Sequence, residues 1–172
     1  MSVKKILTEP NKLLRQVSKA VDKVGKEERM LMDDMLDTMY AAPGIGLAAI
    51  QIGVPKRIIV MDISRDENKK EPRYFVNPVI KNKNKDKVKY EEGCLSVPDQ
   101  FAEIERPNAC EVEYLDYSGK KQVLKADGLL ATCIQHEIDH LEGILFIDYL
   151  SKLKKSMIIK KLSKIKVNRE IF

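Results

Sequence analysis

The chain has 172 residues, a formal net charge of +5 and 44% hydrophobic residues, which suits one soluble domain spanning residues 1–172. It contains no apolar run near the roughly 20 residues that cross a bilayer and no secretory signal, so we expect no membrane partner. Its three cysteines are odd in number and widely spaced, which argues against a disulfide framework and predicts a reduced, cytoplasmic protein that we expect to be a monomer.

The first strong pattern is an amphipathic helix predicted from Glu27 to Tyr40. Leu31, Met35 and Met39 recur at helical spacing along one stripe. We interpret these methionines as core filling, because the flexible thioether side chain fills irregular gaps. The Pro43–Gly44 pair ends the helix.

Strands follow this N-terminal helix. Four segments have the composition or the alternation of strands: Arg57 to Ile63, Tyr74 to Ile80, Cys110 to Tyr114 and Lys121 to Ala126. Pro78, inside the second segment, predicts an edge strand or a bulge, and the charged segment 81–89 is typical of a solvated hairpin or loop. Because the strands occur in runs and do not alternate with helices, we expect an α+β fold whose mostly antiparallel sheets pack around one central helix.

The central helix is predicted from Leu129 to Leu141, with Asp127 as its N-cap and Gly143 at its end. It contains Gln-His-Glu-Ile-Asp-His at residues 135–140, which holds both histidines of the chain. Two histidines four residues apart lie about 40° apart on one helix face, so both imidazoles can bind one divalent metal ion. The alternative is a pair of core histidines bonded to backbone carbonyls, which this spacing and the intervening glutamate disfavour.

Glu137 directly follows the first of these histidines. It is badly placed as a ligand on the same helix face, yet close enough to take a proton from a metal-bound water. Two histidines leave a catalytic metal one protein ligand short. Downstream of the histidines, the possible acidic ligands are Glu142, Asp148 and Glu170. Cys94, upstream, is the better candidate, because a metal-bound thiol ionises. On its own, however, Cys94 would be interpreted as an inert buried thiol.

The C-terminal segment, about residues 150–166, predicts a basic helix. Its apolar residues recur at near-helical spacing: Leu153, Met157, Ile158, Leu162 and Ile165. One interpretation is a helix that packs this stripe on the domain and exposes a solvated basic face. The second adds a phosphate-rich partner on the basic face, and both can hold together.

Three segments together resemble the peptide deformylase family. Its motifs have the forms G-x-G-L-A-A-x-Q, E-G-C-L-S and Q-H-E-x-D-H, and the chain has all three in this order at Gly44–Gln51, Glu92–Ser96 and Gln135–His140. The resemblance covers nearly the whole chain. It implies an enzyme that removes the formyl group from N-formylmethionyl nascent peptides and releases formate.

The resemblance also assigns roles to individual residues. It implies that the metal ligands are Cys94, His136 and His140, with water in the fourth position. The metal would be one divalent ion, Fe²⁺ in the cell, with Ni²⁺, Co²⁺ or Zn²⁺ as substitutes, since a Cys-His-His set suits several metals. Glu137 would act as general base and then general acid on the metal-bound water, while the Gln51 amide and the Leu95 backbone N–H stabilise the oxyanion.

The same resemblance implies how the peptide binds. The backbones of Ile45, Gly46 and Gly93 would hold it in an extended conformation. Its methionine side chain would enter an apolar pocket near Ile45, Tyr90, Leu129, Thr132 and Cys133. Thr132 is more polar and Tyr90 bulkier than this pocket would suggest, and Phe101 stands where many bacterial relatives carry a basic residue.

Two further expectations concern the rest of the chain. We expect Asp139 to pair with a cation behind the central helix, and Arg106 is the candidate. The basic C-terminal helix resembles that of the bacterial form of the family, which implies docking on the ribosome, where RNA phosphate would attract a positively charged protein.

Two other functions share parts of this signal. A zinc endopeptidase would have the same metal, water and glutamate, but would need a groove that activates an internal amide. A non-catalytic metal-stabilised or ribosome-binding module would need a closed site with a fourth protein ligand, and nothing in the sequence marks one.

Overall fold

The computed structural model describes residues 2–64 and 66–170, with side chains described as far as Ile165. The helices are α1 (Lys26–Ala41), α2 (Gly128–Leu141) and α3 (Lys152–Glu170), with short 3₁₀ helices η1 (Lys12–Arg15), η2 (Ala49–Ile52) and η3 (Phe146–Tyr149). The strands are β1 (Gly46–Ala48), β2 (Ile58–Met61), β3 (Arg73–Lys83), β4 (Lys87–Cys94), β5 (Val97–Pro107), β6 (Ala109–Leu115) and β7 (Lys121–Asp127).

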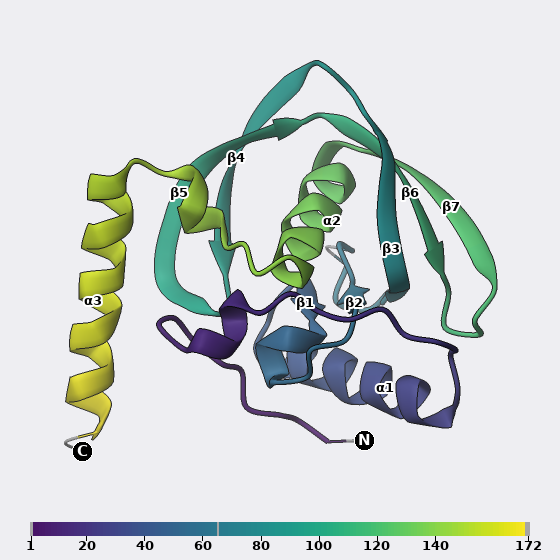
Figure 1. Ribbon diagram of the computed structural model, residues 1–172, viewed down its shortest axis with the longest axis horizontal. Helices are drawn as coiled ribbons and strands as arrows, with labels where there is room; N and C mark the ends of the chain where they lie inside the picture. The colour runs from purple at the N-terminus through teal and green to yellow at the C-terminus, as the bar shows by residue number, and fades with distance from the viewer. Residues whose placement is uncertain (1, 65, 171–172) are drawn as a thin grey trace.

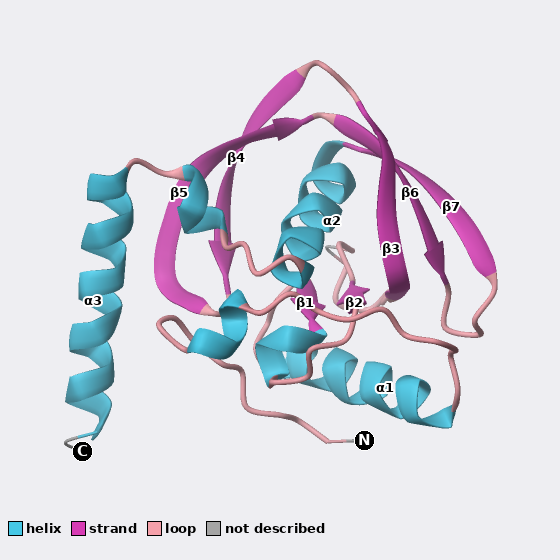
Figure 2. Ribbon diagram, viewed as in Figure 1, coloured by secondary structure: helices cyan, strands magenta, loops and turns pink. Residues whose placement is uncertain are grey.

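The strands form two antiparallel sheets with α2 between them. The larger sheet has the order β1-β2-β3-β6-β7, and β4 pairs with β5 in a separate two-stranded sheet. Figure 1 shows α2 in the middle of the molecule, with β4 and β5 on one side and β3, β6 and β7 on the other. Helix α2 contacts strands of both sheets. The expected α+β fold with a central helix is therefore confirmed (Figure 2).

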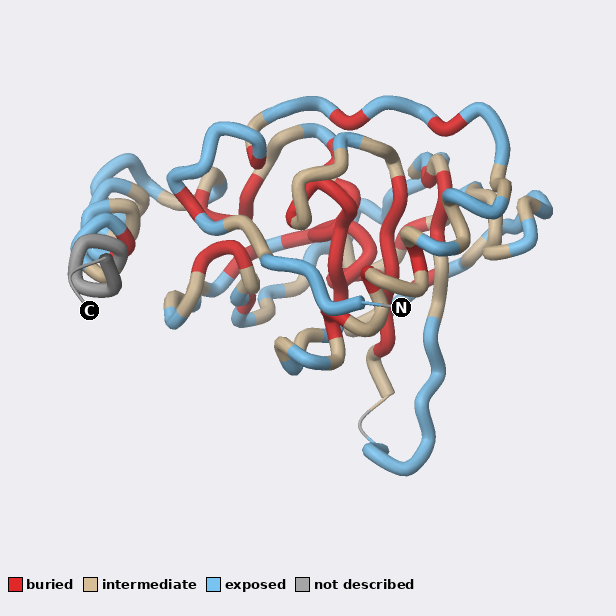
Figure 3. The backbone as a smooth tube through the Cα atoms, turned by 90° about the horizontal axis from the view of Figure 1, so that it is seen from below, coloured by how far each residue is buried: buried red, intermediate tan, exposed pale blue. Residues whose placement is uncertain are grey.

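Apolar packing holds α2 in this position. Ile134 and Leu141 of the helix lie in one buried cluster with Phe75 of β3 and Val112 of β6. Full burial of such a side chain contributes about 1.5–3 kcal/mol. Figure 3 shows the buried backbone gathered through the centre of the molecule, while much of α3 is exposed. The segment 135–140 with its two histidines therefore lies on an enclosed helix.

Helix α1 packs beneath β1 and β2. Met32, Met35 and Met39 are fully buried there, which confirms the interpretation of these methionines as core side chains, but Met30 of the same helix is 58% exposed, so the interpretation is wrong at that position. The helix exceeds the predicted segment by one residue at each end. Gly143 follows α2 with a φ of 72°, a left-handed conformation that favours glycine, and a Cβ at this position would collide with the Arg15 carbonyl. Gly143 thus ends α2 as predicted.

Pro78 predicted that the second strand is either an edge strand or contains a bulge, and the structure shows the bulge. Strand β3 lies between β2 and β6 and is not an edge strand. The bulge is confirmed, because the register between β3 and β6 shifts between Val76 and Val79. Asn77 has a φ of 49° at this point, and its side-chain amide exchanges two hydrogen bonds with the Val21 backbone, of 2.7 and 2.8 Å. The bulge therefore tolerates Pro78 within a central strand.

Segment 81–89 is not a hairpin. It includes the end of β3 and the start of β4, which belong to different sheets, so residues 84–86 carry the chain from one sheet to the other. The β4–β5 pair itself was not predicted. Its strands are rich in exposed Lys and Glu, because one face of the pair is solvated, and the apolar alternation is correspondingly weak.

The C-terminal helix, predicted at about residues 150–166, is present as α3 at Lys152–Glu170, but it packs a different face on the domain. Leu162 is buried against Val97, Ile104 and Phe146. Leu153, with 72% of its surface exposed, and Met157, with 51%, face solvent. The predicted stripe is therefore wrong at these two positions, since Ile158, Ile159 and Leu162 form the packed face instead.

Candidate metal centre and active-site cavity

The three predicted ligand residues lie together. His136 and His140 come from α2, and Cys94 is the last residue of β4. One donor atom from each of the three lies within 4.8 Å of the others. The Cys94 Sγ is 3.3 Å from the His140 Nε2, and the two imidazole rings have centroids 5.1 Å apart. One sulfur and two ring nitrogens therefore converge on one point.

A buried ionic network holds His136 in this orientation. The His136 Nδ1 lies 2.8 Å from the Glu92 Oε1, which leaves the Nε2 to face the cluster. Arg106 donates two hydrogen bonds to Glu92, of 2.7 and 2.9 Å, and a third of 2.8 Å to Asp139. The Tyr149 hydroxyl also donates to Asp139, at 2.7 Å. The expected pairing of Asp139 with Arg106 is thus confirmed.

Glu92 is ionised in this network. Burial alone would raise its pKa, but hydrogen bonds from His136 and Arg106 outweigh burial and hold the pKa below the usual value. A carboxylate on the far nitrogen of a metal-binding histidine fixes the tautomer and the ring orientation. Glu92 therefore performs a role that was not predicted. The sequence feature that could have predicted this role is the two-residue spacing between Glu92 and Cys94, because residues with this spacing lie on the same face of a strand.

The Gln51 side chain is held at both ends. Its Oε1 accepts a hydrogen bond of 2.9 Å from the Ala48 backbone. Its Nε2 donates to the Ser96 Oγ at 3.0 Å and lies 3.5 Å from the Cys94 Sγ. Because the oxygen is occupied on the far side, the amide N–H group faces the cluster. Leu95 lies next to Cys94 in the turn from β4 to β5.

Glu137 lies beside the cluster without being part of it. Its Oε1 is 4.0 Å from the His136 Nε2, and its Oε2 has no hydrogen-bond partner among the described residues. Burial raises the pKa of Glu137 to about 7. A Cβ on Gly46 would come within 2.6 Å of the Glu137 Oε1, so only glycine allows this close approach of β1 to the carboxylate.

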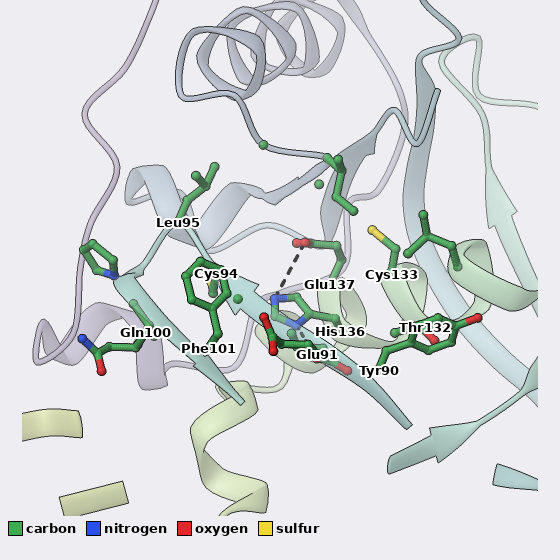
Figure 4. Close-up of a pocket in the computed structure, with 18 of the residues that line it drawn as sticks. Tyr90, Glu91, Cys94, Leu95, Gln100, Phe101, Thr132, Cys133, His136 and Glu137 are labelled. Carbon is green, nitrogen blue, oxygen red and sulfur yellow. Dashed lines mark hydrogen bonds and ion pairs between the residues drawn. The ribbon is translucent and has the colours of Figure 1, made fainter. Parts of the chain in front are cut away.

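Cys94, His136 and Glu137 line a cavity of about 460 Å³, within the range of small-ligand sites. Figure 4 shows Glu137 and His136 beside each other on α2, with Cys94 nearby at the end of β4. The cavity lining includes every residue predicted to bind substrate, namely Ile45, Gly46, Tyr90, Gly93, Leu129, Thr132 and Cys133. Phe101, 65% exposed, also lines it. The structure therefore brings the predicted site residues together from three separate parts of the chain, residues 45–51, 90–95 and 129–140.

The donor set fits a divalent transition metal. Sulfur and imidazole ligands suit iron, zinc, cobalt and nickel, and two of the three donor residues, His136 and His140, are buried. Groups of at least three His, Cys, Asp or Glu able to hold a metal were found at this one place in the described part of the chain. Three protein ligands beside a cavity leave room for water, which is typical of catalytic and not of structural metal sites.

An open Cys-His-His site with an adjacent buried carboxylate, carried by an α+β fold, is typical of metal-dependent hydrolases. Comparison with known proteins identifies the family. Residues 3–156 match the family model described as polypeptide deformylase. The chain is 89% identical over 171 residues to the peptide deformylase of Pelagibacter ubique, covering 99% of each chain.

Solved structures give the same result. The peptide deformylase of Ehrlichia chaffeensis is 45% identical and superposes with a TM-score of 0.91, covering 96% of this chain and 97% of the other. A structure of it in complex with actinonin gives 0.90 at 49% identity, covering 95% and 98%. The chain thus belongs to the peptide deformylase family, whose members remove the N-formyl group from nascent peptides, and the resemblance of the three motifs is confirmed. In the described part of the chain, no helix combines the length and apolarity that crossing a bilayer requires.

Proposed function

We propose that residues 1–172 form one catalytic domain that hydrolyses the formyl amide of N-formylmethionyl peptides and releases formate. The observation that carries this proposal is the convergence of Cys94, His136 and His140 beside the unpartnered carboxylate of Glu137, at the end of a ligand-sized cavity. Family membership supports the same reaction.

Cys94, His136 and His140 would hold one divalent metal ion. When bound there, the ion would act as a Lewis acid that polarises the formyl carbonyl and lowers the pKa of water. We infer Fe²⁺ in the cell, with Ni²⁺, Co²⁺ or Zn²⁺ as substitutes, because one sulfur and two imidazoles suit each of them.

Glu137 acts as the general base and then as the general acid. It takes a proton from the attacking water and passes it to the leaving amine. Its position supports this role, because the carboxylate is buried beside the His136 Nε2, and burial raises its pKa above the ordinary value, toward the pH at which a group can both accept and donate a proton. Gly46 keeps the carboxylate close to His136.

The Gln51 amide and the Leu95 backbone N–H donate hydrogen bonds to the oxyanion that develops from the formyl oxygen. The anchoring of the Gln51 carbonyl oxygen by Ala48 supports this, because it turns the amide nitrogen toward the cluster. The N–H that lies near the Cys94 Sγ, at 3.5 Å, would turn to the oxyanion, while the other N–H stays bonded to Ser96. Loss of one such donor typically costs about 10²–10³ in rate.

The peptide binds between two strands. In the larger sheet β1 is an edge strand, and β4 pairs only with β5 among the described strands, so an extended chain can add to either edge. We assign its backbone contacts to Ile45, Gly46 and Gly93. We place its methionine side chain in the inner part of the cavity, lined by Tyr90, Leu129, Thr132 and Cys133.

The test is formate release from formyl-Met-Ala-Ser by protein prepared anaerobically with Fe²⁺. We expect Glu137→Gln to retain the metal and to lose turnover, and Cys94→Ala to lose both. Glu91→Gln is the matched control, because Glu91 lines the same cavity but is exposed. Cleavage of unformylated Met-Ala-Ser would favour an endopeptidase instead, and full activity of Glu137→Gln would contradict the proposal.

We further propose that the protein acts as a cytoplasmic monomer whose helix α3 docks on the ribosome. Exposed lysines at positions 154, 160, 161 and 164 line this helix and would attract RNA phosphate. Reversing Lys160 and Lys164 to Glu should weaken co-sedimentation with ribosomes while leaving hydrolysis of formyl-Met-Ala-Ser intact. Reversal of Lys85, in the connection between the sheets, and of Lys87, the first residue of β4, is the control, because both lysines are exposed. Equal loss of ribosome binding in both double variants would contradict docking through α3.

A further inference from the structure

Thr132 has an unpaired hydroxyl in the wall of the cavity. The residue is only 4% exposed, and its Oγ1 has no hydrogen-bond partner among the described residues. A buried polar group without a partner is destabilising, because its bond to water is lost and not replaced, so such a group calls for an explanation. A bound ligand that supplies an acceptor would remove this cost.

Helix geometry places this hydroxyl at the side-chain pocket. Thr132 and Cys133 lie three and four residues after Leu129 and four and three residues before His136 along α2, and all four line the cavity. Residues with this spacing share one helix face. Thr132 therefore lies one helical turn from the metal-binding His136. Figure 4 shows it beside Cys133 and Tyr90 in the wall of the cavity.

A buried threonine in a helix commonly bonds to its own backbone instead. Thr38 of α1 does so in this protein: its Oγ1 donates to the Asp34 carbonyl oxygen at 2.6 Å, and the residue is 1% exposed. Thr132 is buried almost as deeply but does not make this bond. The two threonines differ in position: Thr132 lines the cavity, and Thr38 is not among the residues that line it. The free hydroxyl of Thr132 therefore remains available to a bound molecule.

We propose that the Thr132 hydroxyl donates a hydrogen bond to the side chain of the first residue of the substrate, and so makes this pocket selective for a side chain that carries an acceptor. The inference rests on the proposed deformylase function. A thioether sulfur is a weak acceptor and a methylene group is none, so methionine is favoured over norleucine, which has the same shape. A sulfoxide oxygen is a strong acceptor, so a peptide that begins with formylmethionine sulfoxide is also a substrate.

The experiment compares three peptides that differ in one group: formyl-norleucyl-Ala-Ser, formyl-Met-Ala-Ser and formyl-methionine-sulfoxide-Ala-Ser. The kcat/KM for formate release is measured for the native protein, for Thr132→Val, which keeps the shape and removes the hydroxyl, and for Thr132→Ser, which keeps the hydroxyl. Ratios between peptides are the readout, so a general loss of activity in a variant cancels.

We expect the native protein to favour methionine over norleucine about twofold to tenfold, the range of one hydrogen bond, and Thr132→Val to reduce this ratio to about one. The sulfoxide-to-norleucine ratio should fall about tenfold or more in Thr132→Val, because the sulfoxide would then be buried without a partner. Thr132→Ser should retain both native ratios. If Thr132→Val does not fold, Thr132→Ala replaces it, and we expect the same fall in both ratios.

A sulfoxide-to-norleucine ratio that agrees within about twofold between the native protein and Thr132→Val, or a serine variant that behaves like valine, would overturn the inference. The failure of the proposed function is distinguishable: the native protein would then release no formate from any of the three peptides. If formate is released from all three peptides but the ratios do not depend on residue 132, the deformylase function stands and only the role of Thr132 is refuted.

Discussion

Gly46→Ala tests whether the position of Glu137 controls the reaction. A Cβ at residue 46 would lie 2.6 Å from the Glu137 Oε1 and 2.9 Å from its Cδ, whereas ordinary contacts begin at 3.4 Å. The end of a side chain yields more easily than a strand backbone, so we expect the carboxylate to move by about 0.8 Å. A misplacement near 1 Å costs about 10²-fold in rate.

The assay separates catalysis from binding and from folding. We expect kcat for formyl-Met-Ala-Ser to fall about 10²-fold, while thermal unfolding changes little because the strained contact involves one side-chain end. Gly25→Ala is the matched control: its Cβ would also meet a glutamate oxygen, that of Glu28, but at 3.3 Å and far from the cavity. A rise in KM with unchanged kcat would refute the reasoning, because it would mean that the methyl group blocks the peptide and leaves Glu137 in place.

Three further predictions concern the charges behind the site. Glu92→Gln should lower the affinity for Co²⁺ about 10–100-fold in competition with a chromophoric chelator, because it removes the carboxylate that orients the His136 imidazole. Unchanged affinity would mean that the carboxylate does not orient the imidazole. Arg106→Met should lower the free energy of unfolding by about 3–5 kcal/mol in urea titrations, because Glu92 and Asp139 lose the cation between them, and a loss below about 1 kcal/mol would show that the network is dispensable. Burial opposes the ionisation of Asp148, but the hydrogen bonds that Lys155 and Arg15 donate to this carboxylate outweigh burial and lower the pKa of Asp148 below 3.8. This stabilisation is present above pH 3.8 and is lost as the pH falls through the lower folded-state pKa, so Asp148→Asn should reduce the loss of stability on acidification, and identical acid unfolding curves would contradict this.

Local sequence was sufficient for the helices and for the separate parts of the site. The spacing of His136 and His140 places both rings on one face of any α-helix, whatever surrounds it, because the helical repeat depends only on neighbouring residues. The methionines of α1 were predicted as core side chains for the same reason. The three motifs supplied the resemblance that brought Cys94 and Gln51 into the same proposal.

Only the tertiary structure decided which distant groups meet. Arg106 reaches Glu92 because β4 and β5 pair in one register, and a register between strands is set by contacts across the sheet and not by either strand alone. The face that α3 turns to the domain, with Leu162 inside and Leu153 outside, likewise depends on the surface it meets, since its apolar residues allow more than one stripe. The unpaired hydroxyl of Thr132 became visible only once the cavity beside it had formed, because a single polar residue in a helical sequence does not indicate what it faces.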